Sequence, residues 1–107
     1  MIQNKETEEK LSRLQLLEQS RQTINVQKQN FQMRLLEIES ALKELEKSDE
    51  VYKIIGNIML SSNKEELKKE LENEKNMLNL RIDSMNKQEE TIREKMKKLQ
   101  NEIMAKK

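Results

Sequence analysis

The chain has 107 residues, of which 38% are charged, 34% are hydrophobic and 2% are aromatic. This composition is too polar and too poor in large side chains for a self-contained globular core, so the apolar surface must be buried in an extended or shared arrangement. The 21 basic and 20 acidic residues are interspersed and leave a net charge of +1, which argues against a basic face for nucleic acid. The absence of cysteine and histidine excludes disulfides and thiolate chemistry, and it removes the commonest general base and metal ligand.

Long helices are the elements that the rest of the composition favours. Proline is absent, there is a single glycine, and the apolar residues are regularly spaced. The first ten residues contain no apolar run typical of a signal peptide, and no run of about 18 apolar residues occurs. We therefore expect a cytoplasmic protein that does not contact a membrane.

Residues 5–47 are predicted to form the first helix, because apolar residues recur there in alternating steps of three and four. The ten seam positions of this heptad pattern are Leu14, Leu17, Arg21, Ile24, Lys28, Phe31, Leu35, Ile38, Leu42 and Leu45. Such a run is typical of a coiled coil. Arg21 and Lys28 are the two charged exceptions, and they either set register and partner number or extend their stems out of the seam.

Residues 51–61 are predicted to form a β-hairpin, because VYKIIGNIML is rich in β-branched and aliphatic residues around Gly56 and Asn57. A two-residue turn, with the glycine at positive φ, would pair Ile55 with Ile58. Both faces of such a hairpin would be largely apolar. One face would carry Val51, Ile55, Ile58 and Leu60, and the other would carry Tyr52, Ile54 and Met59.

A two-stranded hairpin with two apolar faces and two open edges would aggregate in water unless something covers it. The sequence leaves two possible covers. Equivalent hairpins from other chains could share a sheet or barrel with it. Alternatively, the hairpin could fold back onto the end of its own coiled coil.

Residues 63–106 are predicted to form the second helix. Ser62 and Glu65 fit a capping box at its start. Its seam follows one heptad frame through Leu67, Leu71, Glu74 and Leu78, and a second frame through Ile82, Met85, Glu89, Ile92, Met96, Leu99 and Ile103. The extra step of four from Leu78 to Ile82 is a stutter, which locally unwinds a supercoil.

The two helices are predicted to pair as an antiparallel helical hairpin. Each has about 43 residues and would be roughly 60 Å long, and equal lengths suit helices that fold back on each other. Glutamate and lysine four residues apart, as at Glu6 and Lys10 and at Glu94 and Lys98, support helical structure with a solvated charged face. The expected fold class is therefore predominantly α, with a coiled-coil helical hairpin and a short central β-hairpin that joins an intersubunit β-barrel, in a single domain over residues 1–107.

The central segment resembles a known family. A long helix, the hairpin VYKIIGNIML, a helix of equal length and the approach QKQNFQMRLLEIESALKELEKSDEVYK together resemble the β-class subunits of prefoldin, also called GimC. The resemblance covers nearly the whole chain, and its most specific part is V-Y-K-x-x-G-x-I-x-L from Val51 to Leu60. Subunits of the α class carry two hairpins between their helices, whereas this sequence has one.

The resemblance implies an ATP-independent chaperone subunit in a hexamer of two α-class and four β-class subunits. The hairpins would form a double β-barrel body, and the coiled coils would capture unfolded proteins at their tips and pass them to a group II chaperonin. The residues that would join subunits are Val51, Tyr52, Ile54, Ile55, Ile58, Met59 and Leu60. The tips would be built from the two ends of the chain, and no cofactor is implied.

The ends of the chain carry more apolar residues than a seam uses. Leu11 and Leu16 lie off the seam that contains Leu14 and Leu17, and Met104 lies off the seam beside Ile103. Surplus exposed apolar surface is typical of a binding site, although a frayed seam would have the same pattern. The expected client-binding residues are Leu11, Leu14, Leu16, Leu17, Leu99, Ile103 and Met104. For Met77 and Leu80, near the stutter, a local structural role explains the pattern at least as well.

A structural protein and an enzyme are the two alternatives to a chaperone. A structural coiled-coil dimer or adaptor would use the same heptads but has no evident use for an apolar hairpin at its centre. An enzyme could in principle use Tyr52 and the seam carboxylates Glu74 and Glu89, but helical metal sites of that kind normally include histidine. The sequence therefore favours a protein that is not an enzyme.

Overall fold

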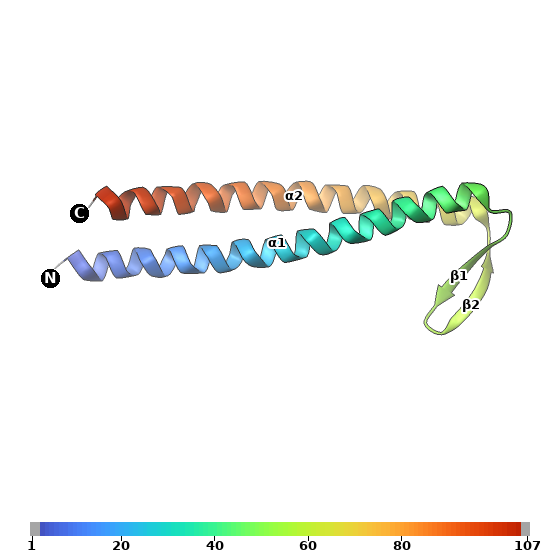
Figure 1. Ribbon diagram of the computed structural model, residues 1–107, viewed down its shortest axis with the longest axis horizontal. Helices are drawn as coiled ribbons and strands as arrows, with labels where there is room; N and C mark the ends of the chain where they lie inside the picture. The colour runs from blue at the N-terminus through green and yellow to red at the C-terminus, as the bar shows by residue number, and fades with distance from the viewer. Residues whose placement is uncertain (1–2, 106–107) are drawn as a thin grey trace. The chain divides into compact units, whose positions relative to one another are not determined.

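The computed structural model describes residues 3–105, which form two helices joined by a β-hairpin (Figure 1). Helix α1 spans Gln3–Lys47, strand β1 spans Val51–Ile55, strand β2 spans Ile58–Ser62 and helix α2 spans Lys64–Ala105. The predicted fold class, with two long helices and a central hairpin, is confirmed. The expected last residue of the second helix, 106, lies outside the described residues.

The chain divides into two units. The hairpin unit contains residues 30–82, that is, the second part of α1, both strands and the first part of α2. The terminal unit contains residues 3–29 and 83–105, and so combines the first part of α1 with the second part of α2. That the whole chain is a single domain stays a prediction.

The hairpin unit has a buried apolar seam between its two helical segments. Ile38 is 1% exposed, and Leu45, Leu78 and Ile82 are also buried. All four are predicted seam positions, and burial of both Leu78 and Ile82 confirms the change of heptad frame between them. Other predicted seam residues of this unit are half-buried, namely Phe31, Leu35, Leu42, Leu67 and Leu71.

The terminal unit has a shallower seam. Leu99 is its buried apolar residue among those described. The remaining apolar seam positions are half-buried, namely Leu14, Leu17, Ile24, Met85, Ile92, Met96 and Ile103. The predicted heptad positions therefore face the partner helix in this unit as well.

Helix α1 ends at Lys47 with its last carbonyl groups satisfied by nearby donors. The Ser48 hydroxyl donates to the Glu44 carbonyl oxygen at 2.9 Å, and the Ser48 amide donates to that of Leu45 at 3.3 Å. Lys64 Nζ, from the first turn of α2, donates to the Glu46 carbonyl oxygen at 3.3 Å. These donors satisfy carbonyls that have no partner within the helix, and they tie the end of α1 to the start of α2.

The hairpin has the predicted register. Ile55 pairs with Ile58 and Lys53 pairs with Leu60 in an antiparallel sheet. Gly56 has a φ of 59° and Asn57 does not have a positive φ, which is the pattern of a type II′ turn. Since successive strand residues alternate between faces, this register fixes which side chains share a face.

Helix α2 begins one residue later than the capping box predicted. Ser62 belongs to β2, and Asn63 is the N-cap residue instead. Asn63 Oδ1 accepts hydrogen bonds from the backbone amides of Glu65 at 2.9 Å and Glu66 at 3.3 Å. The prediction of Ser62 as the cap is therefore wrong, because the strand continues through it and the asparagine satisfies the free amides of the first turn.

Candidate functional site

The hairpin carries a large uncovered apolar surface. Six of its apolar side chains are exposed, at fractions between 47% for Leu60 and 67% for Ile54, and Val51 is half-buried. We call the seven residues predicted to join subunits the hairpin surface: Val51, Tyr52, Ile54, Ile55, Ile58, Met59 and Leu60. The register places them on both faces of the sheet, as the sequence predicts.

Polar contacts connect the hairpin to its surroundings but do not cover it. Lys53 Nζ lies 2.9 Å from Glu70 Oε2 on α2, and the Tyr52 hydroxyl donates to Glu50 Oε2 at 3.1 Å. Both contacts are exposed, so each contributes little to stability. Figure 1 shows the two strands between the end of α1 and the start of α2, which belong to the same unit. The alternative in which the hairpin folds back onto its own coiled coil is not the conformation of the described residues.

The terminal unit contains a groove between its two helical segments, with a volume of about 430 Å³. Its apolar lining consists of Leu16 and Leu17 from α1 and Leu99 from α2. Leu16 is 61% exposed, whereas Leu99 is buried at the seam. We call this the terminal groove. Its charged rim consists of Arg13, Lys95, Lys98 and Glu102.

The structure separates the seven predicted client-binding residues into three groups. Leu16, Leu17 and Leu99 line the terminal groove. Leu14 and Ile103 are half-buried in the seam, and Leu11 and Met104 are exposed outside the groove lining. All seven belong to the terminal unit, but three of them form a continuous surface with the rim.

Lys28 and Glu89 form an ion pair across the seam of the terminal unit. Lys28 Nζ lies 2.7 Å from Glu89 Oε1, and the two side chains are 17% and 12% exposed. Glu89 Oε1 is buried and accepts no hydrogen bond. The positive charge of Lys28 therefore compensates for the burial of this oxygen. Lys28 Nζ also donates to Asn86 Oδ1 at 3.2 Å. The lysine thus crosses to the partner helix, as expected of a seam residue that sets register.

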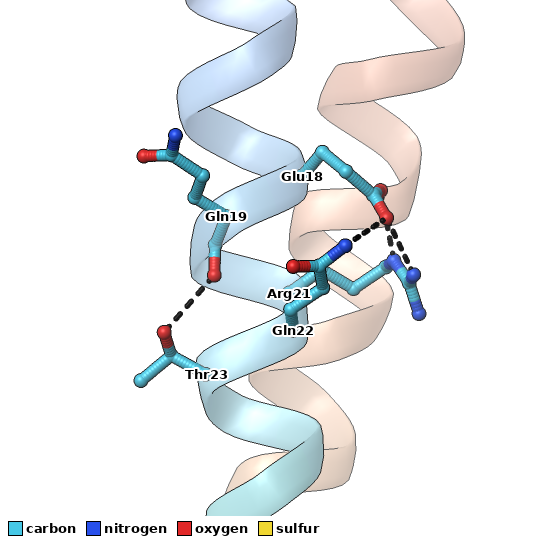
Figure 2. A network of polar contacts seen from close by, with 5 residues as sticks. All are labelled: Glu18, Gln19, Arg21, Gln22 and Thr23. Carbon is cyan, nitrogen blue, oxygen red and sulfur yellow. Dashed lines mark hydrogen bonds and ion pairs between the residues drawn. The ribbon is translucent and has the colours of Figure 1, made fainter.

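Arg21, the other seam cation, turns back to its own helix (Figure 2). Its guanidinium donates to Glu18 Oε1 at 2.6 Å and to Glu18 Oε2 at 3.0 Å. The hydrogen bonds from Arg21 lower the pKa of the Glu18 carboxyl from its ordinary value, and the same contact raises the pKa of Arg21. Arg21 therefore carries its charge out of the seam, which is the second of the two roles considered for it.

The seam carboxylates are both held by cations from α1. Arg34 Nε donates to Glu74 Oε1 at 2.9 Å, and this bond is the main cause of the raised pKa of Arg34. Glu89 is held by Lys28. Among residues 3–105, no group of three or more acidic side chains has an arrangement that could hold a metal ion.

Sequence reasoning missed the charged rim of the terminal groove. Arg13, Lys95, Lys98 and Glu102 look like ordinary members of a solvated helix face, and only the alignment of the two helices shows that they surround one groove. Three exposed apolar residues of α1 were also missed, namely Val26, Met33 and Leu36. Met77 and Leu80 are exposed on α2 in the hairpin unit.

Together these features define a class of protein, namely a coiled-coil assembly subunit whose two helices are joined by an uncovered β-hairpin. Comparison with known proteins gives the family. The family model described as prefoldin subunit matches residues 8–107. The chain therefore belongs to the prefoldin subunit family, whose members are chaperone subunits that assemble with other prefoldin subunits.

Individual relatives agree with this assignment. The prefoldin subunit beta of Methanothrix thermoacetophila is 37% identical over 101 residues, which cover 92% of this chain and 84% of the relative. That of Archaeoglobus fulgidus is 35% identical, with 87% and 83% covered. The crystal structure of the prefoldin beta subunit from Thermococcus strain KS-1 is similar, with a TM-score of 0.86, 29% identity, and 94% and 90% covered. The resemblance to β-class subunits is thereby confirmed.

Within residues 3–105, neither helix is both long and apolar enough to cross a membrane.

Proposed function

We propose that this chain is a β-class subunit of a cytoplasmic, ATP-independent chaperone that captures unfolded proteins at the terminal unit and passes them to a group II chaperonin. The observation that carries the proposal is the terminal groove, an open apolar surface at the ends of a helix pair. Membership of the prefoldin family supports a chaperone role for the chain.

Assembly through the hairpin surface is the first part of the proposal. The chain would join two α-class and three further β-class subunits in a hexamer, with the hairpins sharing a double β-barrel. Support comes from the exposed apolar residues on both faces of the sheet, which a shared barrel would bury. Each fully buried Leu or Ile side chain stabilises such an assembly by roughly 1.5–3 kcal/mol.

Replacing Ile54 by aspartate tests this part. An uncompensated charge in a buried interface costs several kcal/mol, so we expect Ile54→Asp or Ile58→Asp to abolish assembly. The helix content should not change, because neither side chain belongs to the helical seam. Asn57→Asp, which adds the same charge at the polar turn, is the matched control and should assemble. The readout is native mass by light scattering after co-expression with an α-class subunit. A full-size complex from the Ile54 variant would refute the shared barrel.

Capture at the terminal groove is the second part of the proposal. One groove with three leucines offers a small apolar surface, so a single contact would be weak. Several subunits acting on one unfolded chain would add avidity without any further contact. Release would then need a competing partner or folding of the client, with no nucleotide step.

Leu16→Gln tests capture, with Leu36→Gln as the matched control. The two leucines are on α1 and are 61% and 64% exposed, but Leu36 lies outside the groove lining. Loss of one partly buried leucine contact should cost about 1–2 kcal/mol, or roughly a 5- to 30-fold weaker capture. The measurement is suppression of aggregation of a denatured client by the assembled complex. Equal effects of both substitutions would place capture elsewhere. If the unmodified complex gives no suppression, the chain acts as a structural coiled-coil or adaptor protein.

A further inference from the structure

The rim of the terminal groove is predominantly cationic. Arg13, Lys95 and Lys98 surround the three lining leucines, and Glu102 is the one carboxylate among the groove-lining residues. Glu102 is partly neutralised, because Lys10 Nζ lies 3.5 Å from its Oε2 atom. An occupant of the groove would therefore meet an excess of positive charge around an apolar floor.

The cations of the rim are also free to bind a ligand. Within the part of the chain that the structure describes, no hydrogen bond or ion pair engages the side chain of Arg13, Lys95 or Lys98. The pair that the spacing of Glu94 and Lys98 predicts is not formed. By contrast, the charge of Lys28 is already paired with Glu89. Unpaired cations around an apolar groove present a surface complementary to carboxylates.

We infer that the terminal groove selects segments of unfolded protein in which apolar side chains alternate with acidic ones. This inference rests on the proposed function and names the clients that the groove prefers. The apolar side chain would lie on Leu16, Leu17 and Leu99, and a neighbouring carboxylate would reach Lys95, Lys98 or Arg13. The aliphatic stems of the two lysines extend the apolar wall while their charged ends stay in water.

We expect the groove to prefer acidic clients without excluding the others. The three cations of the rim are exposed, so each ion pair with a client adds a modest increment that salt screens. Two such pairs should favour an acidic client about three- to tenfold over a neutral one. A basic client should bind less well than the neutral one, because like charges repel at the rim.

Three labelled, unstructured peptides test the inference with the full-length chain in its purified, assembled form. Leucine alternates with glutamate in the first, with glutamine in the second and with lysine in the third. Fluorescence anisotropy at low and high salt gives their relative affinities. The test variant is Lys95→Gln combined with Lys98→Gln. The matched control is Arg93→Gln combined with Lys97→Gln, which removes the same charge from the same helix outside the terminal groove.

The expected result is a preference for the glutamate peptide that declines with salt, is lost in the test variant and persists in the control. Equal affinities for the three peptides, or equal losses in both variants, would overturn the inference. The Leu16→Gln variant distinguishes failure of this inference from failure of the proposed function. If that substitution weakens all three peptides equally while no charge preference exists, capture at the groove stands and the charge selection fails. If it affects none of them, the proposed capture site itself fails.

Discussion

Substitution of Lys28 by leucine should destabilise the terminal unit by removing the partner of a largely buried carboxylate, that of Glu89. Breaking a fully buried ion pair from one side costs about 3–5 kcal/mol, because the remaining charge is left uncompensated. Here the lysine and Glu89 side chains are 17% and 12% exposed, so solvent reduces the expected loss to about 1–3 kcal/mol. Glu89→Leu should cost less than Lys28→Leu, because the lysine can extend to water and keeps its hydrogen bond to Asn86.

The double substitution of Lys28 and Glu89 by leucine tests whether the two charges stabilise each other or are merely tolerated in the seam. With leucine at both positions the seam gains apolar contact and no charge stays buried, so stability should equal or exceed that of the unmodified chain. The coupling energy from the double-mutant cycle should therefore be large. Arg21→Leu is the control, because Arg21 pairs with Glu18 on its own helix and its loss leaves no buried charge.

Urea unfolding followed by circular dichroism measures these differences. All variants must be compared at one protein concentration, since assembly makes the apparent stability concentration-dependent. If Lys28→Leu is as stable as the unmodified chain, or if the effects of the single substitutions simply add in the double variant, the ion pair does not stabilise the seam.

Two further predictions concern the hairpin and the start of α2. Asn63→Ala should lower the free energy of unfolding by about 1 kcal/mol in urea unfolding, whereas Ser62→Ala should have little effect; the reverse order would restore the capping box predicted from the sequence. Gly56→Ala should loosen the turn by about 1–3 kcal/mol because of its positive φ, although an added Cβ would meet no atom within 4 Å. Amide hydrogen exchange in β1 and β2 should therefore be at least fivefold faster, and Asn57→Ala, at a negative φ, should leave it nearly unchanged.

Features that depend on local spacing could be predicted from the sequence. The heptad pattern predicts which residues face the partner helix, because a helix places residues three and four apart on one side. The hairpin register could be predicted because a two-residue turn at Gly56 and Asn57 fixes which residues pair across the strands. The cap of α2 was predicted one residue early for a specific reason. Ser62 with Glu65, and Asn63 with Glu66, have the same capping-box spacing, and only the length of β2 decides between them.

Features that depend on the alignment of the two helices could not be predicted. Nothing in the heptad pattern says that Lys28 lies opposite Glu89 or that Arg34 lies opposite Glu74. That alignment is set by the hairpin connection and by packing along the seam. The rim of the terminal groove has the same origin, because Arg13 and Lys95 come from different helices and become neighbours only when these helices are paired.

The distribution of buried side chains suits the two parts of the proposed function. The hairpin unit contains Ile38, Leu45, Leu78 and Ile82 in its core, and a firmly packed base is what a shared barrel needs to hold its hairpins in a fixed orientation. In the terminal unit Leu99 alone among the described apolar residues is buried, and the ion pair of Lys28 and Glu89 lies inside the seam, whereas that of Arg34 and Glu74 in the hairpin unit is exposed. A seam of this kind separates at a lower cost than a continuous apolar one, because the charges regain water when the helices part. We therefore expect adaptability to be concentrated where clients of varied shape would bind.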